Sequence, residues 1–549
     1  MTGVRVSTCG WMEKKRRKHR LRCRRRSPIF DYATMKRHRL VSKGSLARRF
    51  EEAAEAWKRQ EYQQTIEILE STARLDPANA RIHLDLGRAY GLRYDFASAE
   101  RCFEKAVRVA PRKMDVLIAA GQRSHEFGSH ELARRYFAQA AEQNDSPAEA
   151  LVRLAELCER EHRLEDAAAL VDRALSSNPK HPSASLARAR LARGAGRLSE
   201  AEEILRSILA GASADSWTRV RVWYELGGIL DRQSRYDEAM AAFLEAKALL
   251  RPAAGPSASA LQLVHDRVKE MEATITPEDL RRWSDQGTAL QPPHRIALLC
   301  GHPRSGTTLL EQVLDSHPDV ISAEETHVFH DEAYLPLSRG VAQDTSILTL
   351  LDSTPARRLQ EARKDYFRCT ELFLGSAIGN RLLLDKNPSL SVMVPVVARI
   401  FPEIKFVAAL RDPRDVCLSC FMQSLPLSPV SSAYLSLEGT VAEYSSVMGL
   451  WRTMSQRMPN PRIEVRYEDM VGDLEAASRR VLEFLGVAWD ERVLRFNEHA
   501  RGKLVRSPTY AEVAKPVFKS AVGRWRNYQK HLEPWLEKLG PFLKAFGYD

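Results

Sequence analysis

Long apolar runs are missing from this 549-residue sequence. The basic segment near its start holds no stretch that could cross a bilayer or form the core of a signal peptide. The eight cysteines are scattered, without the spacing of a disulfide framework, which suits a reducing compartment. The sequence therefore predicts a cytoplasmic protein with no transmembrane segment.

A zinc-binding set of cysteines is also missing. Cys417 and Cys420 have the C-x-x-C spacing, but no second pair accompanies them. We expect these two residues to be neighbours on one helix face rather than a redox or metal site.

Negative charge is scarce only at the start of the chain. The first 50 residues hold 17 Lys and Arg against 2 acidic residues. The whole chain holds 83 basic and 71 acidic residues, so residues 51–549 hold 66 basic and 69 acidic residues, a net charge of −3. Because residues 51–549 carry almost no net charge, we expect the chain to bind no specific nucleic acid. We expect the leader, residues 1–48, to be disordered: a solvated tail, or sequence upstream of a true start at Met35. Nucleic-acid, membrane-surface or localisation roles for the leader are the alternatives.

What the first half does contain is an internal repeat. Small and aromatic residues recur at intervals of 34 between about 50 and 250, among them Ala99, Ala133, Ala167 and Ala201, and also Gly87 with Gly121 and Phe103 with Phe137. A small residue where two helices touch, then an aromatic residue and a closing proline, is the helix-turn-helix pattern of the tetratricopeptide repeat. The pattern predicts a repeat array over residues 49–250, followed by a linker with bridging helices at 251–292, where "RPAAGPSASA" is expected to interrupt the helices.

Such an array stacks helix pairs into a superhelix with a concave groove. The groove is expected to dock a peptide, a protein acceptor or a partner. A spacer or a dimerisation scaffold is the alternative.

From residue 294 the pattern changes to apolar strands that alternate with helices, which predicts a parallel α/β sheet. Residues 296–300 form a short apolar run, "GHPRSGTT" follows at 301–308, and "TLLEQVLDSH" has helical spacing. A glycine loop between a strand and a helix N-terminus is a natural anion site, because free backbone N–H groups converge there. Arg304, Thr307 and Thr308 add donors suited to phosphate or sulfate.

A lysine is absent from this loop. Thr307 stands where a nucleotide-triphosphate loop has its lysine, and no acid ends a later strand to hold Mg²⁺, since "IKFVAAL" at 404–410 ends in Arg411. These absences argue against a kinase or an ATPase. We expect an anion held by arginines and backbone groups, without metal.

Four ordered motifs now carry a resemblance: "PRSGTTLLEQVLDSHPDVISAEET" from 303, "DKNP" at 385–388, "RDPRDVCLSC" at 411–420 and "VGRWRNY" at 522–528. They resemble the sulfotransferases that use 3'-phosphoadenylyl sulfate, with the protein-tyrosine sulfotransferases as the most similar branch. The whole chain resembles bacterial tetratricopeptide-repeat sulfotransferases. The implied fold class is α + α/β: a repeat superhelix, then a P-loop-like sulfotransferase domain with a central parallel sheet at 293–549.

The resemblance implies how the donor nucleotide is bound. The loop residues are expected at its 5'-phosphosulfate, with Arg304 also acting in catalysis; they are Arg304, Ser305, Gly306, Thr307 and Thr308. An arginine and a serine eight residues later are expected at the 3'-phosphate, which matches Arg411 and Ser419. An ion pair of Arg411 with Asp412 or Asp415 is the alternative.

Sulfuryl transfer also needs a base for the acceptor hydroxyl and a cation for the leaving oxygen. "SAEETH" offers Glu324 and Glu325, between which the residues alone do not choose; the resemblance selects Glu325. His317 and His327 are alternative bases, with His317 expected in a turn. Lys386 matches the family's lysine.

Further positions follow from the same resemblance. Asn387 stands where the tyrosine-sulfating relatives have an acid. Tyr467 is expected near the adenosine, and Ser507 and Lys515 on a loop that closes over the nucleotide, with Ser507 also catalytic. Trp525 is expected in that region or in the core.

The expected activity is transfer of a sulfuryl group from 3'-phosphoadenylyl sulfate to an acceptor hydroxyl, with protein tyrosine favoured by the resemblance. A saccharide or a small phenol is the alternative acceptor. A catalytically inactive scaffold that binds protein partners is the alternative function.

Overall fold

The computed structural model describes residues 43–59, 61–143, 148–290, 292–342, 344–502 and 521–548. Most of the predicted disordered leader lies outside these residues. Its last part does not, because the first helix begins at Lys43, within the stretch assigned to the leader. Within the described part of the chain, no helix is long and apolar enough to cross a membrane.

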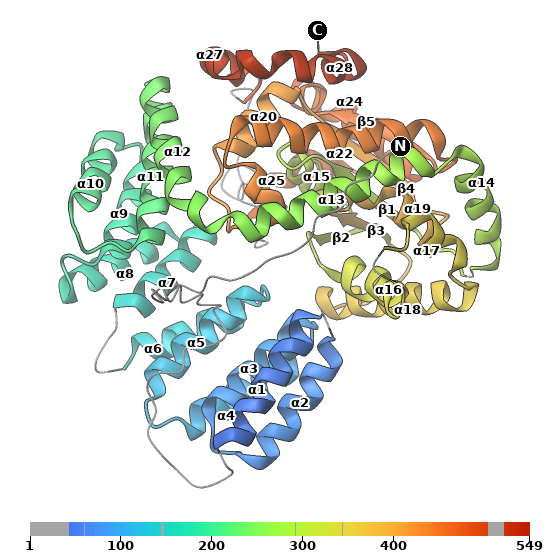
Figure 1. Cartoon of the computed structure of the whole chain (residues 1–549). Helices are drawn as coiled ribbons and strands as arrows, with labels where there is room; N and C mark the ends of the chain where they lie inside the picture. The colour runs from blue at the N-terminus through green and yellow to red at the C-terminus, as the bar shows by residue number, and fades with distance from the viewer. Residues whose placement is uncertain are drawn as a thin grey trace, which may run out of the picture.

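The first half is an array of antiparallel helix pairs, as the 34-residue period predicts (Figure 1). Each glycine at the tight crossing of a pair faces a phenylalanine of the next helix: a Cβ on Gly87 would lie 2.5 Å from Phe103, and one on Gly227 would lie 2.6 Å from Phe243. The repeat helices are α1 (Lys43–Lys58), α2 (Tyr62–Leu75), α3 (Ala80–Leu92), α4 (Phe96–Val109), α5 (Lys113–Glu126), α6 (His130–Ala141), α7 (Ala148–Arg160), α8 (Leu164–Ser177), α9 (Pro182–Gly194), α10 (Leu198–Ala210), α11 (Ser216–Arg232) and α12 (Tyr236–Leu250).

The connection after the array is more helical than its sequence indicates. The expected break at 251–260 is wrong for most of its length: a single 3-10 turn, η1 (Arg251–Ala253), leads directly into α13 (Gly255–Thr274). Pro256 lies in the first turn of α13, where its missing N–H has no helical partner to lose. The next helix, α14 (Pro277–Gln286), starts on a capping box in which Thr276 accepts from the N–H of Asp279.

The second half, residues 296–548 and called the α/β domain below, is built on a five-stranded parallel sheet in the order β2-β3-β1-β4-β5. Its strands are β1 (Ile296–Gly301), β2 (Val320–Glu324), β3 (Leu382–Lys386), β4 (Lys405–Leu410) and β5 (Arg462–Arg466). Its principal helices are α15 (Thr307–Asp315), α16 (Leu335–Ser338), α17 (Ile347–Ser353), α18 (Ala356–Leu374), α19 (Val394–Ile400), α20 (Pro413–Phe421), α21 (Pro429–Ala433), α22 (Leu437–Arg457), α23 (Tyr467–Gly472), α24 (Leu474–Leu485), α25 (Phe496–Gly502), α27 (Gln529–Leu532) and α28 (Leu536–Phe546).

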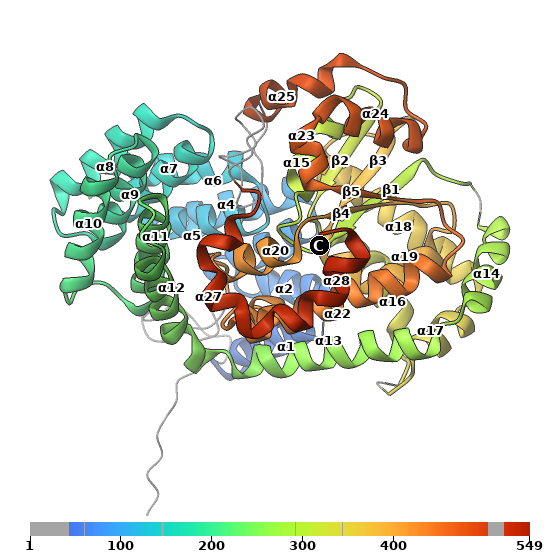
Figure 2. The same cartoon turned by 90° about the horizontal axis from the view of Figure 1, so that it is seen from above.

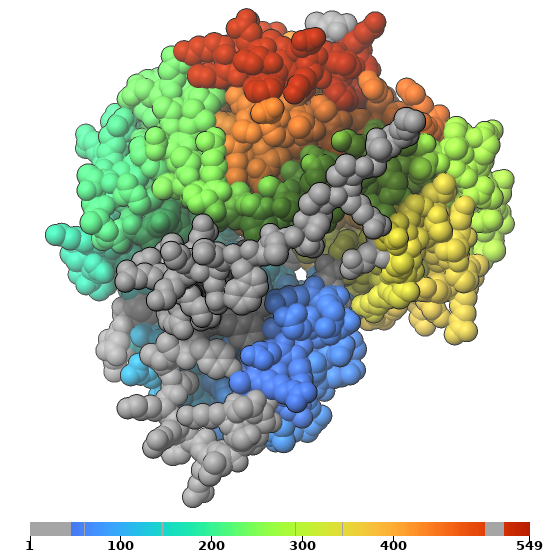
Figure 3. Space-filling model, viewed as in Figure 1, coloured from blue at the N-terminus to red at the C-terminus, as the bar shows by residue number. Residues whose placement is uncertain are grey.

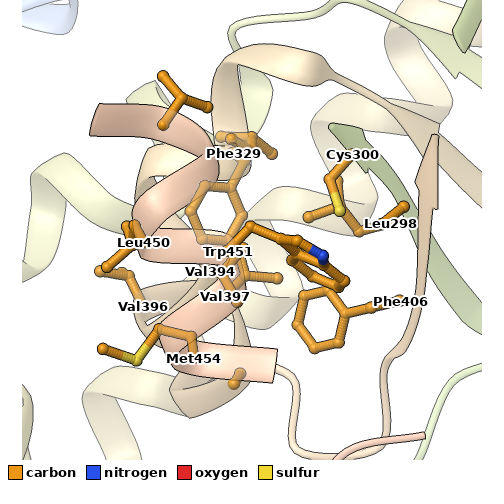
Figure 4. Packing of buried hydrophobic residues seen from close by; sticks show 14 of the residues in the cluster. Leu298, Cys300, Phe329, Val394, Val396, Val397, Phe406, Leu450, Trp451 and Met454 are labelled. Atoms are coloured by element: carbon orange, nitrogen blue, oxygen red, sulfur yellow. The ribbon is translucent and has the colours of Figure 1, made fainter. Parts of the chain in front are cut away.

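Helices cover both faces of the sheet, because successive strand residues point to opposite sides. On one face Leu298 packs with Phe406 and with Trp451 of α22 (Figure 4). On the other face Ala297 and Leu299 pack with α15 and α24. Both faces of β1 are buried, as expected for a parallel sheet enclosed by helices.

The repeat array contacts the α/β domain at both of its ends. Near the start, Arg93 forms an ion pair with Glu332, and the rings of Tyr94 and Phe373 meet edge to face at 5.5 Å. At the far end, α11 and α12 lie beside α20 and α27 (Figure 2). Between these contacts the array curves around one side of the α/β domain (Figure 1).

Candidate active site

Most of the predicted site residues that the structure describes lie at the carboxyl ends of the strands. The 301–308 loop follows β1, Glu324 ends β2 with Glu325 next in the chain, Lys386 ends β3, Arg411 follows β4, and Tyr467 follows β5. The chain runs from β1 outward to β2, returns through β3, and continues with β4 on the other side of β1. Open parallel sheets form their ligand crevice at the carboxyl edge of such a switch point.

Two glycines shape the loop after β1. Gly301 has φ +120°, and a Cβ there would lie 2.3 Å from the carbonyl oxygen of Ala409 on β4. Gly306 has φ +91°, and a Cβ there would lie 2.7 Å from the Tyr467 ring. Only glycine adopts these conformations without strain. The loop therefore runs close to both β4 and Tyr467 and leads directly into α15.

The start of α15 offers donors for an anion. Ser305, Thr307 and Thr308 are all buried around the helix N-terminus. The first N–H groups of a helix have no partner inside the helix, and the helix dipole favours negative charge there. This geometry fits the phosphosulfate of the expected donor.

Ser391 holds the loop in place and was not predicted. Its hydroxyl accepts from the N–H of Gly301 at 2.9 Å and donates to the Gly301 carbonyl at 2.8 Å. Ser391 is fully buried in the 3-10 turn after "DKNP". Nothing in the sequence marks it, because it lies 90 residues from the glycine.

The two arginines assigned to opposite ends of the donor lie together. Arg304 Nε donates to Ser419 Oγ at 3.0 Å, and Arg411 Nη1 donates to the Arg304 carbonyl at 3.3 Å. Arg304 has φ +73°, a left-handed conformation that is costly for a residue with a side chain. Arg304, Arg411 and Ser419 therefore lie in direct contact with one another at the carboxyl edge of the sheet.

Arg411 makes additional contacts. Its guanidinium carbon lies 4.8 Å from the ring centroid of Tyr467, and its Nη2 donates to the carbonyl of Ala521. Asp415 lies 3.8 Å away, so the alternative ion pair is present but long. Among the described residues, the buried Nε of Arg411 has no hydrogen-bond partner. A buried unpaired donor is costly, so an incoming oxygen ligand would be stabilised there.

Glu325 and Lys386 form an ion pair across the ends of β2 and β3. Lys386 Nζ lies 2.7 Å from Glu325 and 3.3 Å from Glu324. The Lys386 side chain is fully buried; burial opposes its charged form, but the nearby carboxylates of Glu325, Glu324 and Glu311 outweigh that effect and raise its pKa. Lys386 is therefore a fixed positive charge at the carboxyl edge of the sheet.

The two glutamates differ in access. The Glu324 side chain is 4% exposed and the Glu325 side chain 42%. Glu325 also has φ +46°, a strained conformation that turns it away from the strand direction. Of the two, Glu325 is the one that a molecule from solution can approach.

The histidine alternatives lie in other surroundings. Both ring nitrogens of His317 are used structurally, since Nε2 contacts the Ala488 carbonyl at 2.9 Å and Nδ1 accepts from Asp319 N–H at 3.0 Å. His327 is exposed in the turn after Glu325. Asn387 fixes that turn, because its Nδ2 donates to the Thr326 carbonyl at 2.7 Å. A carboxylate at this position would have no N–H to donate.

Other predicted positions have mixed outcomes. Ser507 and Lys515 lie outside the described residues. Trp525 is buried in a hydrophobic cluster with the last repeat, and the guanidinium of Arg414 lies 4.1 Å from its ring centroid. Cys417 and Cys420 both lie on α20, and burial raises the pKa of each thiol. Within the described residues, no group of His, Cys, Asp or Glu could hold a metal ion.

Glu311 is a further residue that sequence analysis missed. It is fully buried on α15, where it accepts from the Gln312 side chain at 2.6 Å and helps to raise the pKa of Lys386. An acid inside the apolar helix pattern of "TLLEQVL" is the signal that could have indicated it.

Comparison with known proteins agrees with this geometry. The profile of the sulfotransferase family matches residues 297–491, and tetratricopeptide-repeat profiles match residues 125–191, 159–217 and 218–259. The chain joins tetratricopeptide repeats to a sulfotransferase-family domain. The predicted fold class is thereby confirmed.

Several curated proteins are similar to this chain over about half of its length or more. An uncharacterised Aquifex aeolicus protein is 24% identical over 61% of this chain and 43% of its own length. The protein-tyrosine sulfotransferase of Drosophila melanogaster is 26% identical over 46% of this chain and 52% of its own, and human protein-tyrosine sulfotransferase 1 is 26% identical over 52% and 80%. The chain thus spans about half the length of the first of these relatives.

Solved structures give weaker likenesses. The sulfotransferase domain of the Synechococcus PCC 7002 olefin synthase aligns with a TM-score of 0.34 at 19% identity, covering 47% of this chain and 96% of its own. The Mycobacterium avium sulfotransferase STF9 aligns with a TM-score of 0.31 at 15% identity, covering 62% and 93%. At these scores the alignments carry no further argument.

Proposed function

We propose that this protein transfers a sulfuryl group from 3'-phosphoadenylyl sulfate to an acceptor hydroxyl. In the step, a bond forms between the acceptor oxygen and sulfur while the bond from sulfur to the phosphate oxygen breaks. The acceptor proton goes to a carboxylate, and the leaving adenosine 3',5'-bisphosphate takes the electron pair. No metal ion is part of the proposal, because guanidinium and backbone donors would hold both anionic ends.

The convergence of Arg304, Arg411 and Ser419 carries the proposal. The 301–308 loop and the N-terminus of α15 would bind the 5'-phosphosulfate through backbone N–H groups and the two threonine hydroxyls. Arg411 and Ser419 would bind the 3'-phosphate, and the Nε of Arg411, which has no partner within the described residues, would be available to an oxygen. Tyr467, which packs on Gly306 and under Arg411, would border the adenosine.

Glu325 and Lys386 would perform the chemistry as a pair. Glu325 is the exposed carboxylate at the site and would accept the acceptor proton. Lys386 would stabilise negative charge on the oxygen that leaves sulfur, and its burial means that the charge needs no solvent reorganisation during the step. Positive charge held at 2.7 Å also orients the Glu325 side chain before an acceptor arrives.

The proposed acceptor is a tyrosine in a peptide or protein. The names of the relatives, protein-tyrosine sulfotransferases, support this choice. Arrays of this repeat provide concave surfaces for protein ligands, and this array curves around the domain that holds the site (Figure 1). The array would therefore dock the acceptor or a partner protein.

The test is binding and turnover by the purified full chain. Isothermal titration should detect adenosine 3',5'-bisphosphate binding in the presence of EDTA, and radiolabelled donor should pass label to tyrosine-containing peptides. Glu325→Gln should retain the binding and lose the transfer. Phosphorylation that requires ATP and Mg²⁺, or absence of bisphosphate binding, would overturn the proposal. If the radiolabel is transferred to a glycan and not to a peptide, the acceptor is a saccharide and not tyrosine.

A further inference from the structure

The last repeat, α11 and α12, is fused to the elements that carry the anion site. Apolar residues of both parts form one buried cluster, in which Phe243 of the repeat joins Phe421 of α20 and Trp525 and Tyr528 of the 3-10 turn η6 (Arg524–Tyr528). Figure 3 shows the same contact from outside, with the repeat in green against the orange and red segments. This contact is a shared core rather than a linker between separable units.

Asp231 of α11 anchors η6. One oxygen of Asp231 accepts from the Tyr528 hydroxyl at 2.7 Å, and the other pairs with Arg524 at 2.6 Å. The Asp231 side chain is only 14% exposed and Tyr528 is fully buried. A partly buried carboxylate with two partners fixes its neighbours more strongly than an exposed ion pair does.

The same turn is held from its other side by the anion site. Asp415 of α20 accepts from the N–H groups of Gly523 and Trp525, both at 2.7 Å. Arg411 donates to the carbonyl of Ala521, just before this turn. Residues 521–528 therefore connect Asp231 of the last repeat to Arg411 and Asp415 of the site through consecutive hydrogen bonds.

Lys247 of α12 supports α20 independently. Its fully buried ammonium donates to the Tyr434 carbonyl and to the Tyr224 hydroxyl, and lies 4.1 Å from the ring centroid of Phe421. Phe421 is two residues beyond Ser419 on the same helix. Among the described residues, no carboxylate pairs with Lys247 at ion-pair distance. In its charged form such a buried amine without a counterion costs stability, so stabilisation of the contact does not explain why a lysine lies here.

We propose that Asp231 and Lys247 are positioning residues for the donor site, which makes the last repeat a part of the transferase rather than a detachable docking module. Asp231 holds residues 521–528 against Arg411, and Lys247 holds the helix that carries Ser419. The inference rests on the proposed function, since Arg411 and Ser419 are taken as ligands of the donor nucleotide. It predicts that changes at Asp231 or Lys247 alter donor affinity although neither residue is a proposed ligand of the donor.

The test compares Asp231→Asn with a matched control in the full chain. Asparagine retains an oxygen for Tyr528 but loses the charge that pairs with Arg524. The Kd of adenosine 3',5'-bisphosphate and the donor KM should both rise about fivefold or more, equivalent to roughly 1 kcal/mol, while kcat at saturating donor stays near the wild-type value. The control is Asp237→Asn, on α12: Asp237 pairs with Lys530 of the same C-terminal segment but is 69% exposed. The control should leave Kd and KM unchanged, because exposed ion pairs contribute little.

Two further variants separate positioning from general stability. Tyr528→Phe removes only the hydroxyl that Asp231 accepts, and Lys247→Met retains the length of the side chain without the charge. Both should raise the donor KM without a matching loss of kcat. Thermal midpoints are measured for every variant, and Tyr528→Phe decides the question if Asp231→Asn does not fold.

The outcomes are distinct from those of the proposed function. A wild-type chain that does not bind the bisphosphate overturns the proposed function itself. A wild-type chain that binds, with Asp231→Asn and Tyr528→Phe giving wild-type Kd and KM, overturns the positioning roles alone. A fall in kcat with unchanged donor KM overturns them as well, since it would place the effect in a later step.

Discussion

The buried ammonium of Lys247 should make the stability of this protein depend on pH in a defined window. Burial lowers the pKa of Lys247 to about 7 in the folded chain, against a reference value of 10.5. The folded chain therefore releases this proton at lower pH than the unfolded chain. Below pH 7 the folded state bears the full cost of the buried charge, and stability rises with pH between about 7 and 10.5 as that cost disappears.

The size of the effect follows from the two pKa values. Between pH 6 and pH 8.5 the contribution of Lys247 should become more favourable by about 2 kcal/mol, at 1.36 kcal/mol for each pKa unit. The phenol and thiol groups that face Lys247 do not titrate in this window in the folded chain. Burial raises the pKa of Tyr224 and of Cys420 to about 12 and that of Tyr434 well above 10.

The assay is denaturant or thermal unfolding of the wild type and Lys247→Met at both pH values. Methionine removes the titrating group, so the stability difference between wild type and variant should shift by about 2 kcal/mol in favour of the wild type as pH rises. The difference cancels the many other groups that titrate in both chains. A difference that does not change with pH would refute the reasoning, because it would mean that Lys247 keeps an ordinary pKa in the folded chain.

Three further predictions concern the site and the array. Glu325→Gln should lower kcat about 100-fold or more without changing the Kd of adenosine 3',5'-bisphosphate, because it removes the base but no residue that binds the donor. Radiolabelled transfer measures kcat, and titration calorimetry measures Kd. A nearly unchanged kcat would exclude Glu325 as the base. Ser391→Ala should leave both backbone groups of Gly301 without their hydroxyl partner, which should cost about 1–3 kcal/mol of stability for each buried group. It should also weaken bisphosphate binding. Wild-type binding by this variant would show that the loop keeps its conformation without Ser391. Gly227→Ala should lower the thermal midpoint by the equivalent of about 1–3 kcal/mol, because the added Cβ would lie 2.6 Å from Phe243. Gly228→Ala should raise the midpoint, because its Cβ would meet no described atom within 4 Å beyond its chain neighbours and its own helix backbone. Two equal shifts would contradict the packing argument.

Periodic and local features could be predicted from sequence alone. The 34-residue recurrence predicts paired helices because every repeat buries the same small and aromatic positions, as Gly87 and Phe103 illustrate. The run of a strand, the Gly301 to Thr308 loop and α15 could be predicted because the elements are adjacent in the chain. One local prediction was wrong: the two prolines and the glycine of 251–260 indicated a break, but Pro256 fits the first turn of α13.

Contacts between distant residues were decided only by the tertiary structure. The sequence does not indicate which of the adjacent residues Glu324 and Glu325 is exposed. The parallel pairing of β2 with β3 places Glu324 in the buried sheet beside Lys386 and leaves Glu325 accessible. Ser391 reaches Gly301 across 90 positions of the chain. Asp231 meets Tyr528 across 297 and Lys247 meets Tyr434 across 187. The sequence by itself determined the helix pairs, the strands and the glycine loop, since these depend on neighbours within a few residues. Which charges are buried, paired and reachable depends on how the whole chain encloses them, and the sequence holds no local trace of that.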